Sequence, residues 1–325
     1  MYGSHRGLPR IAMLRALTAV TLILGVVLGL LGVASPASAV TPGCGGNRVP
    51  SADTTHTTRV GGVTRTYRVH VPRGYTGRSS FPLVLAFYGH GEKSPKFERY
   101  TGLSDLPAIV IYPDATIGTD STTSWQGAPY SSPKADDVAF TSTMLREIRA
   151  SFCVDRNRTF AVGRSNGGGL VSMLTCRLSG EFAAYAIVNG AYYDQTWRAC
   201  PGGRTGAGAP PLSVIDFHGT SDPIIHYDGG VRFGERYTPI PDVLTAWSRR
   251  NACLPAPVQA PLSATTTIVD YPLCAALGHE IVHYRITGAG HGWPGARLAT
   301  ATGPGTKVAA TQLIWQFFGR HPRTA

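Results

Sequence analysis

The sequence predicts an α/β fold in which a mostly parallel sheet is covered by helices on both faces. Apolar runs such as residues 81–88 and 108–113 alternate along the chain with segments of helical periodicity such as residues 243–250, and this alternation is typical of a parallel sheet. The unbroken apolar character of the runs indicates strands that are buried on both sides. Because no repeat or second set of elements is visible, residues 40–325 are expected to form a single domain.

The first 39 residues have the features of a secretory signal peptide. Three arginines precede an apolar run over residues 16–34, and Ala37-Ser38-Ala39 supplies a small-residue cleavage site. The run is nearly long enough to span a bilayer, but the cleavage signature favours its removal. We therefore expect cleavage after Ala39, a secreted extracellular protein, and no membrane association afterwards.

Composition argues against several functional classes. The formal net charge of +11 falls to about +8 when the three arginines of residues 1–39 are removed. The basic residues are scattered, without the concentrated stripe of a nucleic-acid-binding protein, so nucleic acid is not an expected partner. All six cysteines follow residue 39, which predicts three disulfides in an exported chain. No cysteine pair has zinc-ligand spacing, so no metal site is expected.

The expected elements follow one another in a regular order. A hairpin over residues 59–71 turns at a Gly-Gly pair, and later strands are expected at residues 81–88, 108–113, 159–162, 182–188, 212–217 and 280–286. Helices are expected at residues 136–148, 170–178, 243–250 and 309–318. Asp136 and Asp137 are both interpreted as N-terminal caps of the first of these helices. The loops that leave the strands lie at the carboxyl edge of the sheet, where such folds bind ligands.

The prediction of function begins at Gly163-Arg164-Ser165-Asn166-Gly167, between the strand at residues 159–162 and the helix at residues 170–178. In this context G-x-S-x-G predicts a nucleophile elbow, a sharp strand-to-helix turn that holds a serine hydroxyl above the sheet. Glycines are needed because the turn is strained and its ends pack closely. The bare pattern also arises by chance in a Gly-rich chain, so the groups that follow Ser165 decide its meaning.

Ser165 needs a base and an orienting acid to act as a nucleophile. Asp222 and His291 follow it at the ends of two later strands, in the order serine, acid, histidine that α/β-hydrolases use. Considered separately, Asp222 is explained as a turn residue and His291 as an ordinary loop histidine. Their joint position after Ser165 nevertheless favours a catalytic triad. Weaker candidates lie within strands or further from a strand end: Asp216, Asp228, His218 and His283.

Acyl transfer also needs hydrogen-bond donors for the developing oxyanion. One is expected to be the backbone amide of Asn166, at the start of a helix. The other is expected from the loop after the strand at residues 81–88, at Gly89 or His90. Amides are favoured there over the His90 side chain.

Five motifs together resemble the secreted esterases grouped with polyhydroxybutyrate depolymerases and feruloyl esterases, the family-one carbohydrate esterases. The motifs are the elbow over residues 163–169, residues 136–140, 153–158, 217–223 and 290–295. Fungal-type feruloyl esterases are the most similar within the group, on the features Gly43-Cys44-Gly45, residues 190–193, residues 227–230 and Gly234-Glu235. The chain departs from the family at Tyr88-Gly89, where the family has His-Gly, and this places the shape of the pocket there in question.

The resemblance implies an α/β-hydrolase fold and a monomeric serine esterase that needs no cofactor. The implied substrate is a feruloylated or acetylated plant cell-wall polysaccharide, with ferulate released from xylan through an acyl-enzyme. Alternatives with the same chemistry are hydrolysis of poly-3-hydroxybutyrate, another aliphatic polyester, or acetylxylan. A non-catalytic extracellular binding protein on the same scaffold is an alternative of a different class.

Aromatic residues near the strand ends are candidates for an acyl pocket, although ordinary packing explains each of them equally well. They are Tyr88, Trp125, Tyr130, Tyr192, Tyr193 and Trp293.

The disulfides are assigned from the positions of the cysteines in the expected fold. Cys253 and Cys274 flank one insertion before the last strand and are expected to pair. Cys153 with Cys176 is favoured next, because both are expected near the lower ends of neighbouring helices, and Cys44 with Cys200 is then the remaining pair. Connectivity does not follow from sequence alone.

Overall fold

The computed structural model describes residues 43–45, 53–203, 207–297 and 308–323. The chain divides into two units, Met1–Val40 and Thr41–Ala325, and every described residue belongs to the second. The expected signal peptide, residues 1–39, therefore lies outside the described residues. None of the described helices is long and apolar enough to cross a membrane.

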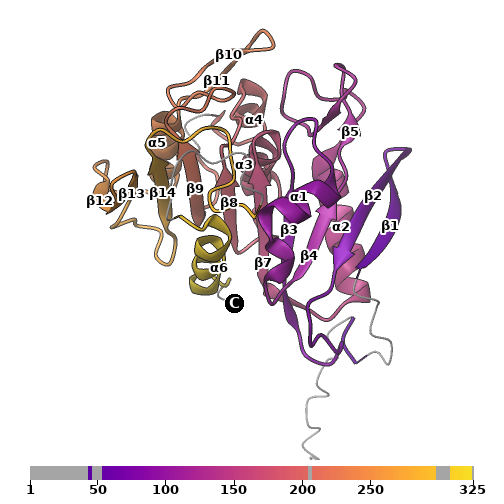
Figure 1. The fold of residues 1–325 in the computed structure, drawn as a ribbon. Helices are drawn as coiled ribbons and strands as arrows, with labels where there is room; N and C mark the ends of the chain where they lie inside the picture. Colours follow the sequence, from indigo (N-terminus) through magenta and orange to yellow (C-terminus); the bar gives the residue numbers. More distant parts are fainter. Residues whose placement is uncertain (1–42, 46–52, 204–206, 298–307, 324–325) are drawn as a thin grey trace, which may run out of the picture. The chain divides into compact units, whose positions relative to one another are not determined.

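The described residues form one ten-stranded sheet, in the order β1-β2-β4-β3-β7-β8-β9-β14-β13-β12 (Figure 1). The six central strands, from β4 to β14, run parallel. The outer strands are antiparallel. The bounds are β1 (Asp53–Val60), β2 (Val63–His70), β3 (Phe81–Phe87), β4 (Ile109–Pro113), β7 (Val154–Arg164), β8 (Ala184–Val188), β9 (Val214–Gly219), β12 (Val258–Ser263), β13 (Thr266–Asp270) and β14 (Ile281–Ile286).

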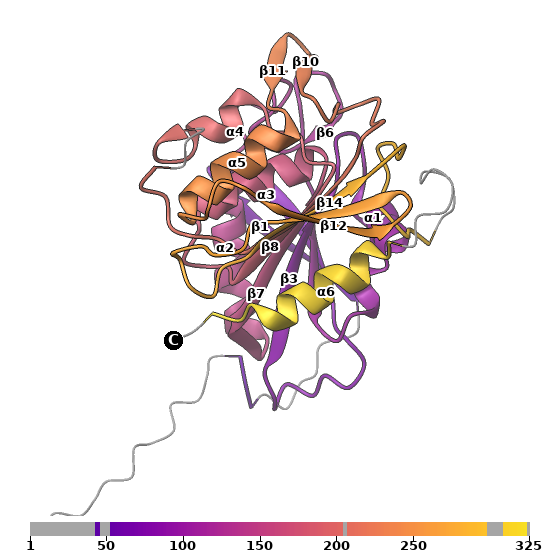
Figure 2. The same ribbon diagram turned by 90° about the vertical axis from the view of Figure 1, so that its left-hand side faces the viewer.

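Helices cover both faces of this sheet. Figure 2 shows α1 and α6 on one side and α2, α3 and α5 on the other. The prediction of a mostly parallel sheet between helices is confirmed. The helices are α1 (Ser94–Thr101), α2 (Asp137–Ser151), α3 (Asn166–Arg177), α4 (Asp194–Arg198), α5 (Ile240–Arg250) and α6 (Ala310–Arg320), with a 3-10 helix at Leu103–Asp105. Short strand pairs complete the described part: β5 (Thr116–Ile117) with β6 (Thr123–Ser124), and β10 (Gly230–Arg232) with β11 (Glu235–Tyr237).

The two acids before α2 have different roles. The carboxylate of Asp136 accepts a hydrogen bond from the amide of Ala139 at 2.8 Å, so Asp136 is the expected helix cap. Asp137 is fully buried and forms an ion pair with Arg65 at 2.7 Å, and it also accepts from the amide of Gln126. Burial raises the pKa of Asp137, and the positive charge of Arg65 opposes that shift. The capping interpretation of Asp137 is therefore wrong.

The cysteines of the described chain form three disulfides, and two of the predicted pairings are wrong. Cys253 is bonded to Cys274, as expected. Cys44 is bonded to Cys153, and Cys176 to Cys200. The N-terminal arm approaches the end of α2 directly, since a Cβ on Gly43 would lie 2.3 Å from the carbonyl oxygen of Phe152. That approach across 109 residues of sequence brings Cys44 to Cys153.

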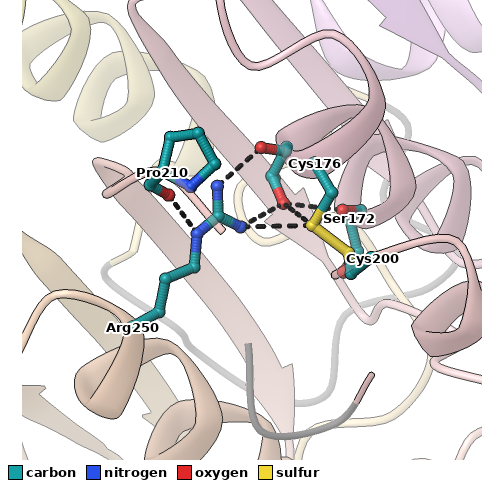
Figure 3. The surroundings of a disulfide bond; sticks show 6 residues. Ser172, Cys176, Cys200, Pro210 and Arg250 are labelled. Carbon is teal, nitrogen blue, oxygen red and sulfur yellow. Dashed lines mark hydrogen bonds between the residues drawn. A yellow bond between two sulfur atoms is a disulfide. The ribbon is translucent and has the colours of Figure 1, made fainter. Parts of the chain in front are cut away.

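The Cys176–Cys200 disulfide lies beside a half-buried arginine, Arg250 (Figure 3). Arg250 of α5 donates to the hydroxyl and carbonyl oxygens of Thr175, at 2.7 and 2.6 Å, and to the carbonyl of Pro210. Burial lowers the pKa of Arg250 to about 10, so the guanidinium stays charged at neutral pH. Arg250 thereby joins α5 to the end of α3, where the disulfide fastens α3 to the segment after α4.

Candidate active site

Ser165 occupies a strained turn between β7 and α3. Its φ of 54° and ψ of −122° place a non-glycine residue in a sparsely populated region. Its amide donates to the carbonyl of Val188 at 2.9 Å, and its carbonyl accepts from the amides of Gly169 and Ala191, both at 3.0 Å. These bonds hold the turn between β8 and α3.

The glycines of the elbow are required by close backbone approaches. A Cβ on Gly163 would lie 2.3 Å from the carbonyl oxygen of Gly167. A Cβ on Gly167 would lie 2.3 Å from the carbonyl oxygen of Phe87. Any side chain at either position would therefore push α3 away from the strands, which is the packing that the sequence pattern predicts.

Asp222 and His291 are in direct contact. Nδ1 of His291 donates to Oδ2 of Asp222 at 2.6 Å, while Oδ1 of Asp222 accepts from the amides of Ile224 and Ile225 at 2.8 and 3.0 Å. Burial alone would raise the pKa of Asp222, but hydrogen bonds from His218 and His291 outweigh it and lower the pKa below its usual value. Asp222 is therefore ionised, and it holds His291 with Nε2 as the unprotonated nitrogen.

The side chain of His291 is only 12% exposed, although it lies in a loop. Burial lowers the pKa of the imidazole, and the hydrogen bond to Asp222 opposes that shift in part. The neutral form of His291 is consequently favoured at neutral pH, which is the form that can accept a proton.

The competing candidates have other partners. Asp216 lies within β9, fully buried, and accepts from the hydroxyl of Tyr192 at 2.8 Å and from Nδ1 of His283 at 2.7 Å. Nε2 of His218 donates to the carbonyl of Ile225 at 2.8 Å and lies 3.4 Å from Oδ2 of Asp222. Both residues are fully buried in β9, Asp216 within the strand and His218 as its penultimate residue, before the loop of Asp222.

The loop of His291 meets the serine elbow. The guanidinium of Arg164, directly before Ser165, donates to the carbonyl of His291 at 2.5 Å. The side-chain amide of Asn189, at the end of β8, donates to the carbonyl of Gly292 at 2.6 Å. The structure thus brings the loops after β7, β8, β9 and β14 together at the carboxyl edge of the sheet, and of the three expected residues it pairs Asp222 with His291 directly.

The loop after β3 approaches from the other side. A Cβ on Gly89 would lie 3.2 Å from the Cβ of Ser165. The amide of Gly89 donates to Oε2 of Glu92 at 2.8 Å, so the expectation that Gly89 supplies a free donor is wrong. The described residues provide no acceptor for the backbone amides of His90 and Asn166, which remain available to a ligand.

The side chains of His90 and Asn166 are held by the protein. Nε2 of His90 lies 2.7 Å from Oδ2 of Asp120 and 2.6 Å from Oγ1 of Thr122. The Asn166 amide group forms a two-way bridge with Trp125, accepting from its amide at 2.7 Å and donating to its carbonyl at 3.2 Å. The side chains of both residues are therefore engaged within the protein, which leaves their backbone amides as the candidate donors.

Comparison with known proteins finds similarity to esterases. No protein-family model matches the chain. Feruloyl esterase D of Neurospora crassa is 26% identical over 321 residues, covering 94% of this chain and 97% of that protein. Feruloyl esterase C of Emericella nidulans is 25% identical over 288 residues, covering 85% and 90%. The crystal structure of acetyl xylan esterase from Aspergillus awamori matches with a TM-score of 0.57 at 14% identity, covering 82% of this chain and 99% of that one.

The protein is an esterase of the α/β-hydrolase type.

The aromatic residues that the sequence suggested for its acyl pocket are part of the core of this esterase. Each of the five is at most 1% exposed, so none offers surface to a ligand, and the prediction is wrong for them: Tyr88, Trp125, Tyr192, Tyr193 and Trp293. Their polar atoms serve the fold. The hydroxyl of Tyr88 accepts from the amide of Ala115, and the indole of Trp293 donates to Thr311.

A different aromatic residue, not expected from the sequence, packs against the loop after β3. Phe233 is the turn residue of the β10–β11 hairpin, with a φ of 52° and an exposed fraction of 48%. Its ring lies 5.9 Å from that of His90 and 4.7 Å from that of Tyr130. Figure 1 shows the hairpin projecting beyond the end of the sheet. The signal in the sequence was the Gly-rich stretch that ends at Gly234-Glu235, which marks a hairpin turn.

Proposed function

We propose that the protein is a secreted serine esterase that releases ferulate from plant cell-wall xylan through a Ser165-His291-Asp222 triad. The observation that carries the proposal is the Asp222–His291 hydrogen bond beside the strained Ser165 turn. Three disulfides fit an oxidising compartment, which supports export after removal of residues 1–39 and leaves residues 40–325 as the catalytic domain. The feruloyl esterases of Neurospora crassa and Emericella nidulans support the choice of substrate.

The proposed chemistry follows from the roles of the three side chains. Nε2 of His291 takes the proton of Ser165 as Oγ attacks the ester carbonyl, and Asp222 stabilises the imidazolium that forms. The tetrahedral oxyanion is held by the amides of His90 and Asn166, the latter at the N-terminus of α3. His291 then protonates the leaving alcohol, and water hydrolyses the acyl-enzyme by the same steps.

The apolar surface beside the site suits an aromatic acyl group. The exposed ring of Phe233 packs on the ring of His90, whose amide is a proposed oxyanion donor, and Ile224, 36% exposed, directly follows the acid loop. An aromatic ring such as that of ferulate can stack against Phe233.

An ester panel tests the proposal. The mature protein is expected to hydrolyse methyl ferulate with a higher kcat/KM than an acetate ester or a hydroxybutyrate ester, because only the aryl group contacts Phe233. Liquid chromatography of the released acids provides the measurement, with Ser165→Ala as the blank. If methyl ferulate is inert while either aliphatic ester is cleaved, the serine chemistry stands and the substrate is acetylated polysaccharide or an aliphatic polyester. A chain that cleaves none of them supports the non-catalytic alternative.

The pH profile provides a second test. His291 acts as a base only when neutral, and burial lowers its pKa. Activity should therefore be lost on acidification only below about pH 6.5, the usual pKa of histidine. The measurement is kcat/KM for methyl ferulate between about pH 4 and 8. An acid limb centred above that usual value would contradict the assignment of the mostly buried His291 as the base.

A further inference from the structure

We infer that the ion pair between Arg164 and Glu92 is a positioning device. It fixes the loop that carries the oxyanion donor His90 against the loop that carries His291. It therefore sets the rate of acyl transfer rather than the affinity for the ester. This inference rests on the proposed function. The oxyanion loop is residues 88–92, and the histidine loop is residues 288–295.

Arg164 holds both loops with the two ends of one guanidinium. Nη1 donates to Oε1 of Glu92 at 2.7 Å, and Nη2 donates to the carbonyl of His291 at 2.5 Å. The guanidinium also lies over the ring of Tyr100, 5.8 Å from its centroid. Because Arg164 directly precedes Ser165, the same side chain relates the nucleophile, the base and the oxyanion loop to one another.

Glu92 extends this connection to the backbone of the oxyanion loop. Its second oxygen, Oε2, accepts from the amide of Gly89 at 2.8 Å, and its own amide donates to the carbonyl of Gly89 at 3.2 Å. The amide of Gly91 donates to the carbonyl of Thr123 at 2.9 Å. With the peptide groups on either side of it fixed, the peptide of His90 has one orientation, and its amide stays free for the substrate oxyanion.

The packing leaves little freedom at this point. A Cβ on Gly89 would lie 3.2 Å from Nη1 of Arg164, from Oε2 of Glu92 and from the Cβ of Ser165. The side chains of Arg164 and Glu92 are only 10% and 20% exposed, so solvent cannot substitute for either partner. A planar guanidinium donates in two fixed directions at once, whereas a lysine ammonium is a point charge on a flexible stem.

The expected consequence is kinetic. Oxyanion donors act only if they are aimed at the position of the charge in the transition state, and loss of one donor lowers kcat by about 10² to 10³. A displacement of about 1 Å lowers the rate by roughly 10²-fold. Loosening the loop without removing its amide should therefore reduce kcat by about 10- to 100-fold. Ester binding, which depends on the apolar surface at Phe233, should change little.

The test uses Glu92→Gln and Arg164→Lys in the full mature chain, with methyl ferulate as the substrate. Both are expected to lower kcat by about 10- to 100-fold, with KM within about threefold of the wild type. A fluorophosphonate titration carried to its end point gives the concentration of competent Ser165, so that unfolded protein is not counted in the enzyme concentration from which kcat is calculated. The matched control is Arg149→Lys, which alters another partly buried Arg–Glu pair, Arg149 with Glu181, that contacts none of the site loops. It should lower thermal stability without changing kcat.

The results of these measurements distinguish a failure of the inference about the ion pair from a failure of the proposed function. If kcat per competent serine in both variants equals that of Arg149→Lys, or if the loss lies in KM, the pair has only a structural role and the inference is overturned. If the wild type hydrolyses no ester, or if Ser165→Ala retains its activity, the proposed function fails instead.

Discussion

Ser165→Ala is expected to lower kcat/KM for methyl ferulate by about 10⁴-fold or more, since removal of a triad nucleophile leaves only the contribution of binding and the oxyanion donors. The substitution removes one oxygen atom and keeps the Cβ, so the strained backbone at φ 54° is unchanged. The melting temperature should therefore stay close to that of the wild type. The measurements are initial rates together with thermal unfolding.

A second serine serves as the control. Ser172 lies in α3 and is buried, and Ser172→Ala should retain activity within a few-fold. A fluorophosphonate should label the wild type and Ser172→Ala at Ser165 and should not label Ser165→Ala. Unaltered ester hydrolysis by Ser165→Ala would exclude this serine as the nucleophile and would favour a non-catalytic use of the scaffold.

Asp222→Asn is expected to lower kcat by about 10⁴-fold. The carbonyl of the new amide can keep the bonds to the amides of Ile224 and Ile225, which now go to Oδ1. Its NH₂ group then faces Nδ1 of His291, which must become the acceptor. The proton of the imidazole is thereby moved to Nε2, the nitrogen that should accept the proton of Ser165. Steady-state kinetics of the folded variant measure the effect.

Asp216→Asn is the matched control for this substitution. Asp216 is also buried and also accepts from Nδ1 of a histidine, His283, at 2.7 Å, but it lies inside β9. Its loss should reduce stability while kcat of the folded fraction remains within about threefold of the wild type. A larger effect on kcat from Asp216→Asn than from Asp222→Asn would identify Asp216 as the orienting acid.

The sequence was most informative where the signal is local. The alternation of apolar strands and helices predicted the parallel sheet, because burial on both faces requires unbroken apolar runs. Gly163 and Gly167 predicted the elbow, and the structure shows why they are glycines: a Cβ at either position would lie 2.3 Å from a backbone oxygen. The order of Ser165, Asp222 and His291 followed from placing loops at strand ends, and Cys253 and Cys274 bracket one short segment.

The aromatic residues show that a local sequence pattern is not sufficient to predict which side chains line the site. Tyr192 and Tyr193 follow a strand end, as a pocket residue would, yet both are buried. Phe233 lies further along the chain and reaches His90 only through the β10–β11 hairpin. Proximity to a strand end in sequence does not specify whether a side chain points into the core or out of it, because helices and loops from elsewhere decide what covers it.

The sequence by itself therefore determined the class of fold, the elbow and the three candidate catalytic residues, since each depends on neighbours in the chain or on strand order. Only the tertiary structure decided the pairing of Cys44 with Cys153, the engagement of the Gly89 amide by Glu92, and the bridge from Arg164 to Glu92 and His291. These contacts join segments separated by many residues or depend on one side-chain rotamer. Their free energy comes from packing that forms only when the whole domain is folded.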